Sequence, residues 1–138
     1  MIKTTITAVF CTGAEEVWRA ATDLEGWSWR SDLVHVKPDG DGIHFIVEYT
    51  RKGTAVRYSV AEKETAKRFV FEMENQNLSG RCTGDFQVLP EGGTKIRLTE
   101  EVMIKKKLLY FLACWRKSVQ RMQQQYILDL KRHLGEMS

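Results

Sequence analysis

The sequence lacks the features that cross-link, anchor or export many small proteins. Its three cysteines are an odd number, and none of them shows the CxxC spacing of a zinc or redox motif. They argue against a disulfide framework and a zinc site, and they favour free thiols in a reducing compartment. No window approaches the roughly 18 apolar residues that a membrane span needs. After Lys3, threonine alternates with apolar residues, so we expect no signal peptide and a cytoplasmic location.

Familiar catalytic and nucleotide-binding motifs are also missing. There is no GxSxG, P-loop or GxGxxG segment, and the glycine-rich stretches have the composition of hairpin turns. The three histidines are not at metal-ligand spacing, and no cysteine or aspartate completes a site around them. The net charge of +3 is too small to indicate nucleic acid binding. We therefore expect no metal, no cofactor and no nucleic acid partner, and the sequence assigns no catalytic residue.

The strongest positive pattern lies in the last third of the chain. Apolar residues recur there at spacings of three and four, which predicts one long amphipathic helix over residues 106–134. Its apolar stripe consists of Leu108, Leu112, Trp115, Val119, Met122, Tyr126 and Leu130. The stripe must pack on an apolar surface, and the preceding strands can supply one. A long helix across a curved sheet often encloses a cavity, so the pattern favours a protein that holds an apolar small molecule.

The residues before this helix alternate between apolar and polar, which is the period of strands with one buried face. The first strand covers residues 2–10. Thr12 and Glu15 then form a capping-box pattern that opens a short helix to about Thr22. Residues 23–30 predict a turn or a second short helix. Six strands follow between residues 31 and 104, and in the first of them Val34 and Val36 alternate with polar neighbours.

Short connections favour antiparallel neighbours in this sheet. The sequence therefore predicts an α+β fold in a single domain over residues 1–138. The expected architecture is a curved antiparallel sheet of about seven strands wrapped on a long C-terminal helix, with one or two short helices after the first strand.

Three segments carry a more specific pattern: TGAEEVWRAATDLEGW (12–27), YSVAEKETAKRFVFEME (58–74) and LSGRCTGDFQVLPEGGTKIRLTEEV (78–102). The last one combines a glycine-containing strand, a PxGG-type hairpin and a TEE ending before the helix. Together they resemble the START-like superfamily, also called SRPBCC or helix-grip, which includes the polyketide cyclase/dehydrase and lipid-transport group. The resemblance covers essentially the whole chain. It implies the fold strongly and the activity weakly, because the superfamily hosts carriers, enzymes and chaperone activators.

The resemblance implies an apolar ligand between the concave face of the sheet and the long helix. Strand and helix parity then give the candidate lining: Phe45, Tyr49, Tyr58, Phe71, Phe86, Leu98, Trp115, Val119, Met122 and Tyr126. Alternatively, these side chains fill the interior as an ordinary core. The hydroxyls of Tyr49 and Tyr58 could orient a ligand, or they could bond to the backbone or to water.

Glu100 is the most informative polar candidate. It shares strand parity with Leu98 and Val102, so its carboxylate is expected to point inward. A carboxylate in an apolar interior should find a partner or have a raised pKa. Glu100 would then anchor a ligand or act as an acid or base, or it would reach solvent or a basic residue near the start of the helix. Asp32 is a weaker candidate of the same kind.

Three functions remain open at this point. The first is binding of a hydrophobic small molecule, such as a lipid, a polyketide or an aromatic metabolite. The second is a cyclase or dehydratase that uses Glu100 or a tyrosine as its proton-handling group. The third is a protein-interaction module with a filled core, such as a chaperone activator. Lys105, Lys106 and Lys107 indicate either contact with an anionic membrane surface or a solvated loop. Tyr110 and Leu128 lie off the apolar stripe, where they could form a dimer contact. We therefore expect either a monomer or a homodimer.

Overall fold

The computed structural model describes residues 1–50, 55–105 and 112–136, and in those ranges it contains seven strands and two helices. The strands are β1 (Ile2–Phe10), β2 (Leu33–Pro38), β3 (His44–Tyr49), β4 (Ala55–Glu64), β5 (Arg68–Glu74), β6 (Leu78–Val88) and β7 (Thr94–Ile104). The helices are α1 (Ala14–Thr22) and α2 (Leu112–His133). All strands form one antiparallel sheet with the order β1-β7-β6-β5-β4-β3-β2. The predicted α+β fold is confirmed, with one short helix after β1.

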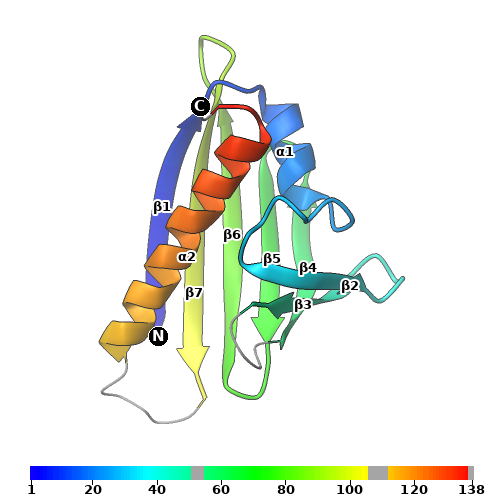
Figure 1. Ribbon diagram of the computed structural model, residues 1–138, viewed down its shortest axis with the longest axis vertical. Helices are drawn as coiled ribbons and strands as arrows, with labels where there is room; N and C mark the ends of the chain where they lie inside the picture. Colours follow the sequence, from blue (N-terminus) through cyan, green and yellow to red (C-terminus); the bar gives the residue numbers. More distant parts are fainter. Residues whose placement is uncertain (51–54, 106–111, 137–138) are drawn as a thin grey trace.

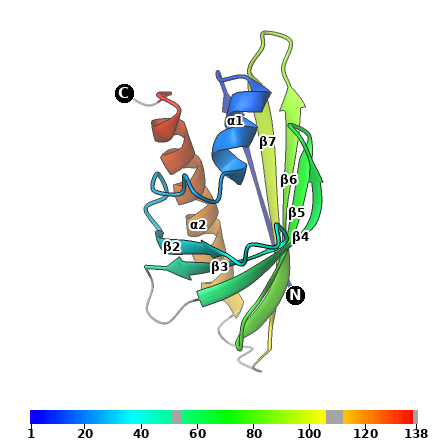
Figure 2. The ribbon, with the colours of Figure 1, turned by 90° about the vertical axis from the view of Figure 1, so that its right-hand side faces the viewer.

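The sheet curls around α2. Figure 1 shows α2 lying obliquely over the part of the sheet formed by β1 and β7, with α1 beside the C-terminal end of α2. In the perpendicular view, β2 and β3 turn out of the plane of the long strands toward α2 (Figure 2). The concave face of the sheet therefore surrounds the inner face of α2 from two directions.

The main core lies where α1, α2 and the long strands meet. Trp18 of α1 packs edge-on against Phe86 of β6, with 5.2 Å between ring centroids. Phe69 of β5 packs against both rings, with centroid distances of 6.0 Å to Trp18 and 5.9 Å to Phe86, and Leu130 of α2 is fully buried in the same cluster. The rings of Phe69 need space at Gly84, because a Cβ there would lie 2.4 Å from the nearest atoms of the Phe69 ring. Gly84 therefore allows β5 and β6 to carry this aromatic core.

The end of α2 is fastened to the beginning of the fold. Gly135 has φ +75°, its N–H donates to the carbonyl of Arg132, and the N–H of Glu136 donates to the carbonyl of Lys131. These bonds form a Schellman motif, which closes the helix and redirects the chain. The Glu136 carboxylate then accepts hydrogen bonds from the backbone N–H groups of Cys11 and Thr12, at 2.7 and 3.1 Å.

This contact overturns one local prediction. The hydroxyl of Thr12 does not cap α1, because it donates to the carboxylate of Glu136 instead. Gly13 occupies the N-cap position, and no side chain caps the helix. A carboxylate is a stronger hydrogen-bond acceptor than a neutral group, so the long-range contact prevails over the capping box. The sequence pattern alone contained no sign of Glu136.

Two further expectations differ from the structure. In β2, Leu33 and Val36 are buried while Val34 is exposed, because the pairing with β3 shifts register between Leu33 and His35. Such a bulge changes which side chains face inward. The predicted helix start at residues 106–111, including Leu108, lies outside the described residues, so the described helix begins at Leu112.

Candidate functional site

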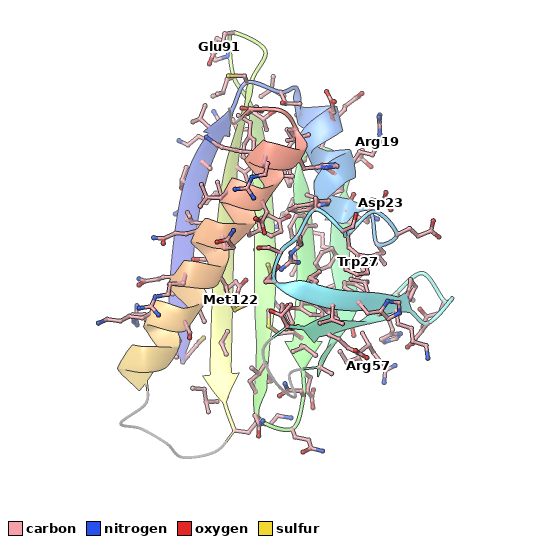
Figure 3. The ribbon with its side chains drawn as sticks, viewed as in Figure 1. Arg19, Asp23, Trp27, Arg57, Glu91 and Met122 are labelled. Atoms are coloured by element: carbon pink, nitrogen blue, oxygen red, sulfur yellow. The ribbon has the colours of Figure 1, made fainter. Side chains whose placement is uncertain are left out.

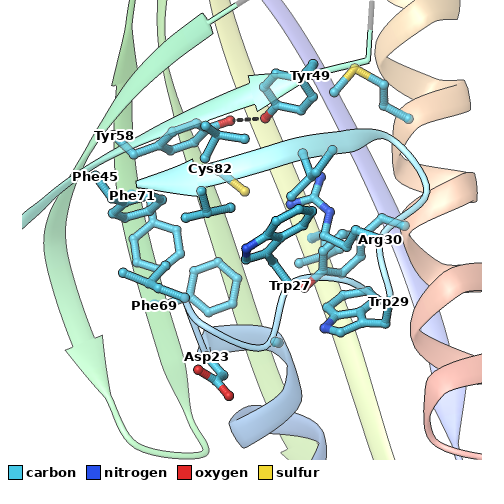
Figure 4. A pocket seen from close by; sticks show the side chains of 18 of the residues that line it. Asp23, Trp27, Trp29, Arg30, Phe45, Tyr49, Tyr58, Phe69, Phe71 and Cys82 are labelled. Carbon is cyan, nitrogen blue, oxygen red and sulfur yellow. Dashed lines mark hydrogen bonds between the residues drawn. The ribbon is translucent and has the colours of Figure 1, made fainter. Parts of the chain in front are cut away.

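An apolar cavity of ≈ 100 Å³ lies between the concave face of the sheet, α2 and the segment that joins α1 to β2. Figure 4 shows aromatic side chains from β3, β4 and β5 facing Trp27, Trp29 and Arg30 of that segment. The long helix contributes Met122, which lies on the side of α2 that faces the sheet (Figure 3). Three parts of the fold that are distant in sequence thus build one enclosure.

Most of the predicted lining residues meet in this cavity. Those that line it are Phe45, Tyr49, Tyr58, Phe71, Leu98, Glu100, Met122 and Tyr126. The parity argument therefore placed them on the correct face, although their contact with a ligand remains a prediction.

Of the other three predicted residues, two do not line the cavity, and the third has a side chain that the structure does not describe. Phe86 points inward, but Trp18 of α1 covers it, so it belongs to the solid core beside the cavity. Val119 is buried on α2 and lies outside the lining. The side chain of Trp115 lies outside the described part of the chain, so its predicted role stays open.

The sheet side of the cavity is a connected set of rings. Phe45 and Tyr58 stack with their centroids 5.2 Å apart, and Phe71 meets Phe45 edge-on at 5.6 Å. Phe69 stacks on Phe71 at 4.7 Å, which connects this wall to the core beneath α1. The hydroxyls of Tyr49 and Tyr58 bond to each other at 2.5 Å (Figure 4). The two hydroxyls therefore pair with each other through one hydrogen bond, which is a partner beyond the expected ligand, backbone or water.

The segment between α1 and β2 forms a wall that the sequence did not reveal. Trp27, Trp29 and Arg30 all line the cavity, although residues 23–30 have no helical or strand periodicity. Trp29 packs edge-on against Tyr126 at 5.3 Å and stacks on His133 at 5.8 Å, so both contacts tie the segment to α2. Two tryptophans and an arginine in a short irregular segment were the available signal, because such residues seldom occur together in a solvated loop.

A buried carboxylate on α2 holds this segment in place. Asp129 accepts hydrogen bonds from the backbone N–H and the hydroxyl of Ser31, both at 2.8 Å, and from the amide of Gln125 at 2.8 Å. Burial raises the pKa of Asp129, but the hydrogen bonds from Ser31 and Gln125 outweigh burial and keep the pKa below its usual range. Asp129 is therefore ionised at neutral pH and fixes the segment to the helix.

Arg30 brings a positive charge to the cavity, and Asp32 balances it. The Nε and Nη2 atoms of Arg30 donate to the two carboxylate oxygens of Asp32, at 3.1 and 2.8 Å. The guanidinium also lies 5.0 Å from the centroid of the Tyr126 ring, which is a cation–π contact. Burial acts to lower the pKa of Arg30, but the surrounding tyrosines and Asp32 outweigh it. The pKa is therefore raised above its usual value, and the guanidinium stays charged. Asp32, a weaker candidate from sequence, thus forms an ion pair with Arg30.

Glu100 lies on β7 with its side chain toward the cavity, as its parity predicted. Burial is the main cause that raises its pKa to about 7, and Asp32 adds to the increase while Arg30 opposes it. Its carboxylate forms no hydrogen bond or ion pair with a described residue. Glu100 is only half-buried, which leaves the predicted access to solvent open. The alternative in which Glu100 pairs with a basic residue of the predicted helix start involves residues outside the described range. Near neutral pH, the protonation of Glu100 is therefore balanced between its two forms.

The tyrosines and the cysteine of the cavity are held neutral. Burial raises the pKa of Tyr49 to about 12 and keeps the pKa of Tyr58 and Tyr126 well above the usual tyrosine value. Burial and the nearby Glu100 also raise the pKa of the Cys82 thiol. A neutral thiol is a poor nucleophile, so Cys82 is part of the apolar lining. Glu100 is thus the group in this cavity whose charge changes near neutral pH.

One surface group among the described residues has the composition of a metal site. The ligand atoms of Asp39, Asp41 and His44 lie within 4.8 Å of one another at the turn between β2 and β3. However, Asp41 already accepts hydrogen bonds from the backbone N–H groups of Ile43 and His44, and from the His44 ring at 2.6 Å. These bonds, led by the one from the His44 side chain, lower the pKa of Asp41. The hydrogen bonds of the turn account for this cluster, and the sequence reading missed it.

The basic segment after β7 is described only in part. The ammonium group of Lys105 pairs with Glu74 at 2.9 Å, while Lys106 and Lys107 lie outside the described residues. The predicted membrane contact therefore remains a prediction. Within the described residues, neither helix is long and apolar enough to cross a membrane.

In the helix-grip arrangement, a curved antiparallel sheet wraps around one long C-terminal helix, and an apolar cavity lies between the two. Comparison of the sequence with family models agrees with this class. The chain belongs to the family described as polyketide cyclase / dehydrase and lipid transport, whose model matches residues 1–135. The predicted resemblance is therefore confirmed. Among curated proteins, no sequence matches that of this chain.

Solved structures show the same fold at low sequence identity. A START superfamily protein from Mycobacterium smegmatis has a TM-score of 0.81 and 11% identity, with 99% of each chain covered. A conserved protein from Geobacillus kaustophilus has a TM-score of 0.83 and 7% identity, covering 98% of this chain and 96% of that one. BexL, a di-domain ARO/CYC protein of the BE-7585A biosynthetic pathway, has a TM-score of 0.80 and 17% identity. The match covers 98% of this chain and 47% of BexL, so this chain corresponds to about half of that protein.

Proposed function

We propose that this protein binds a hydrophobic small molecule in the cavity between the sheet and α2. The observation that carries the proposal is the cavity itself, which has mostly apolar and aromatic walls and a few convergent polar groups. Small-molecule sites in proteins commonly have this composition, because apolar walls supply affinity and a few polar atoms fix orientation. Membership of a family named for polyketide cyclases and lipid transport supports the same function.

The cost of the cavity supports this proposal as well. Empty volume in a protein core costs about 24 cal/mol per Å³. A dry cavity of ≈ 100 Å³ would therefore lower stability by about 2 kcal/mol. Larger side chains at Ala20 or Ala21, which both line the cavity, would fill part of this space. A ligand or bound water that occupies the space would offset the cost.

An enzyme of the cyclase or dehydratase type is the second candidate. The observation that favours it is the pKa of about 7 for Glu100, because a general acid or base works best when its pKa is near the working pH. The raised pKa values of Tyr49 and Tyr58 leave Glu100 without an evident second proton-handling group. Replacing Glu100 with glutamine separates the two candidates. Lost turnover with retained binding would support an enzyme, while unchanged turnover would exclude Glu100 as its acid or base.

The interaction module is less well supported. It requires a filled interior and an exposed apolar patch. The described structure instead has a cavity, and its exposed large apolar residues lie on several different elements: Met1, Val9, Val34, Ile43, Val88, Met103 and Leu128. Single exposed apolar residues of this kind are normal on protein surfaces.

Two experiments test the proposed binding function. Native mass spectrometry of the protein as purified from cells would detect a bound molecule, and denaturing extraction would identify its class. Tryptophan at Phe71 or Met122 should then reduce binding of that molecule, or of a small apolar probe such as p-xylene, because both residues line the cavity and are only partly buried. These positions are preferable to Leu98, which also belongs to the main core.

The matched control is tryptophan at Leu128, which is 42% exposed on α2 and does not line the cavity. All three variants should keep the circular dichroism spectrum of the wild type. Binding that survives in both cavity variants would contradict the proposed location of the site.

A further inference from the structure

The size of the cavity restricts what it can hold. Its volume is ≈ 100 Å³, whereas an engineered apolar cavity of about 150 Å³ binds benzene. The cavity therefore has about two-thirds of that volume, and it holds at most one aromatic ring, with a small movement of its lining residues. A long acyl chain or a molecule of several fused rings would require the walls to move apart. The described structure thus favours a small, flat ligand.

The carboxylate of Glu100 needs a hydrogen-bond donor that the described residues do not provide. Its direct neighbours across the sheet are Thr4 on β1 and Cys82 on β6. The hydroxyl oxygen of Thr4 is buried without a hydrogen-bond partner, so it does not donate to Glu100. Cys82 offers a thiol, which is a weak donor. Glu100 is half-buried, so water that reaches the cavity can solvate its carboxylate, and a ligand that displaces this water must supply a donor in its place.

The balance of charge determines which kind of donor fits. Arg30 is paired with Asp32, and no other cation among the described lining residues compensates ionised Glu100. An anionic ligand would add a second negative charge in a region of low dielectric, where repulsion is strong. A neutral ligand that donates a hydrogen bond avoids this repulsion and satisfies Glu100.

We propose that the cavity selects a monocyclic phenol, whose ring packs among the aromatic side chains and whose hydroxyl donates to the carboxylate of Glu100. This inference rests on the proposed binding function and adds the chemical class of the ligand. Phe45, Tyr58 and Phe71 form the apolar surface for the ring. The hydroxyl of the ligand supplies the donor that Glu100 lacks, so Glu100 determines specificity.

The test compares p-cresol with p-xylene, which differ by a hydroxyl in place of a methyl group. Isothermal titration calorimetry at pH 8.5 should show that the wild type binds p-cresol at least about tenfold more tightly, because hydrogen bonds to charged groups are among the stronger ones. Methionine at Glu100 removes the acceptor and keeps an apolar side chain of similar length, so the preference should fall to within about twofold. The matched control is methionine at Glu101, which follows on β7 with its side chain on the opposite face of the sheet and should keep the wild-type preference.

Lowering the pH gives a second measurement on the unmodified protein. Protonation of Glu100, whose pKa is about 7, should reduce the preference for p-cresol between pH 8.5 and pH 5.5. The other titratable groups around Glu100 are Arg30 and Asp32 of the α1–β2 segment, Tyr49, Tyr58, Cys82 and Tyr126. The arginine stays charged and paired with Asp32, and the raised pKa values of the tyrosines and the thiol keep them neutral over this range.

The outcomes separate this inference from the proposed function. Equal affinity of the wild type for p-cresol and p-xylene would overturn the phenol specificity and leave apolar binding intact. Tighter binding of 4-methylbenzoate than of p-cresol would also overturn it, because Arg30 would then recognise an anion. Failure of all three compounds to bind would overturn the phenol specificity. The proposed binding function would be overturned as well if native mass spectrometry also found no bound molecule. If the Glu100→Met variant does not fold, a preference of the wild type that is insensitive to pH would overturn the role of Glu100.

Discussion

Replacing Asp129 with alanine should lower the free energy of unfolding by about 3 kcal/mol. Asp129 accepts two hydrogen bonds from Ser31 and one from Gln125, each at 2.8 Å, and its side chain is 1% exposed. Hydrogen bonds to charged groups contribute about 1.5–3 kcal/mol each. The two bonds from Ser31 alone would give about 3–6 kcal/mol. Relief from burying the charge offsets part of this loss, so we expect the lower end of the range.

Urea denaturation at neutral pH, followed by circular dichroism, measures this effect. Ser31→Ala removes the hydroxyl and keeps the backbone N–H, so it should cost about 1.5 kcal/mol, the lower end of the range for one such bond. Gln124→Ala, at an exposed position of the same helix, is the control and should stay within about 0.5 kcal/mol of the wild type. A loss below about 1 kcal/mol for Asp129→Ala would refute the view that this carboxylate fixes the α1–β2 segment.

The same residue should contribute to acid unfolding. Because the pKa of Asp129 is lowered in the folded state, its stabilisation is complete above the unfolded value of about 3.9. It is lost as the pH falls through the lower folded value. The difference in stability between the wild type and Asp129→Ala should therefore shrink in strong acid. A difference that stays constant down to the lowest pH would show that charge plays no part.

Three other changes test separate parts of the structure. Gly84→Ala should destabilise the fold by about 1–3 kcal/mol in urea denaturation, because its Cβ would lie 2.4 Å from Phe69. Phe69→Leu in the same chain should recover part of the loss. Tyr49→Phe should cost about 1 kcal/mol, and the double variant with Tyr58→Phe should cost less than the sum of the single variants, because no hydroxyl is left unpaired. Since the folded state raises the pKa of Glu100 to about 7, stability should fall by about 2 kcal/mol from about pH 5 to about pH 8, and Glu100→Gln should flatten this dependence.

Strand parity explains both the success and the limit of the sequence-based site. Alternation showed correctly that Phe45, Phe71 and Glu100 face the interior, because side chains on a strand alternate between the two faces. Parity does not tell where along that face a helix fills the space. Phe86 has the same orientation as the cavity residues, but Trp18 packs on it and makes it part of the core.

The parts that the sequence did not predict depend on contacts between distant residues. Trp27 and Arg30 belong to a segment without periodicity, and its position depends on the bond between Ser31 and Asp129, which are 98 residues apart. Thr12 likewise follows its distant partner Glu136 instead of its local capping pattern. Local rules describe how a segment prefers to fold, and these contacts show where the tertiary structure overrides that preference.

The pairing of the first strand with the last has a consequence for how the protein folds. In the register of β1 with β7, Ile2 lies opposite Val102 and Phe10 lies opposite Thr94. The remaining strands pair with their neighbours in sequence, whereas β1 lies at the edge of the sheet and pairs with β7 alone. Such a high-contact-order pairing slows folding, since a long loop must close before it forms. During synthesis, β1 would therefore have no pairing partner until β7 had emerged from the ribosome. The cavity would form last, because residues of β7 and α2 line it.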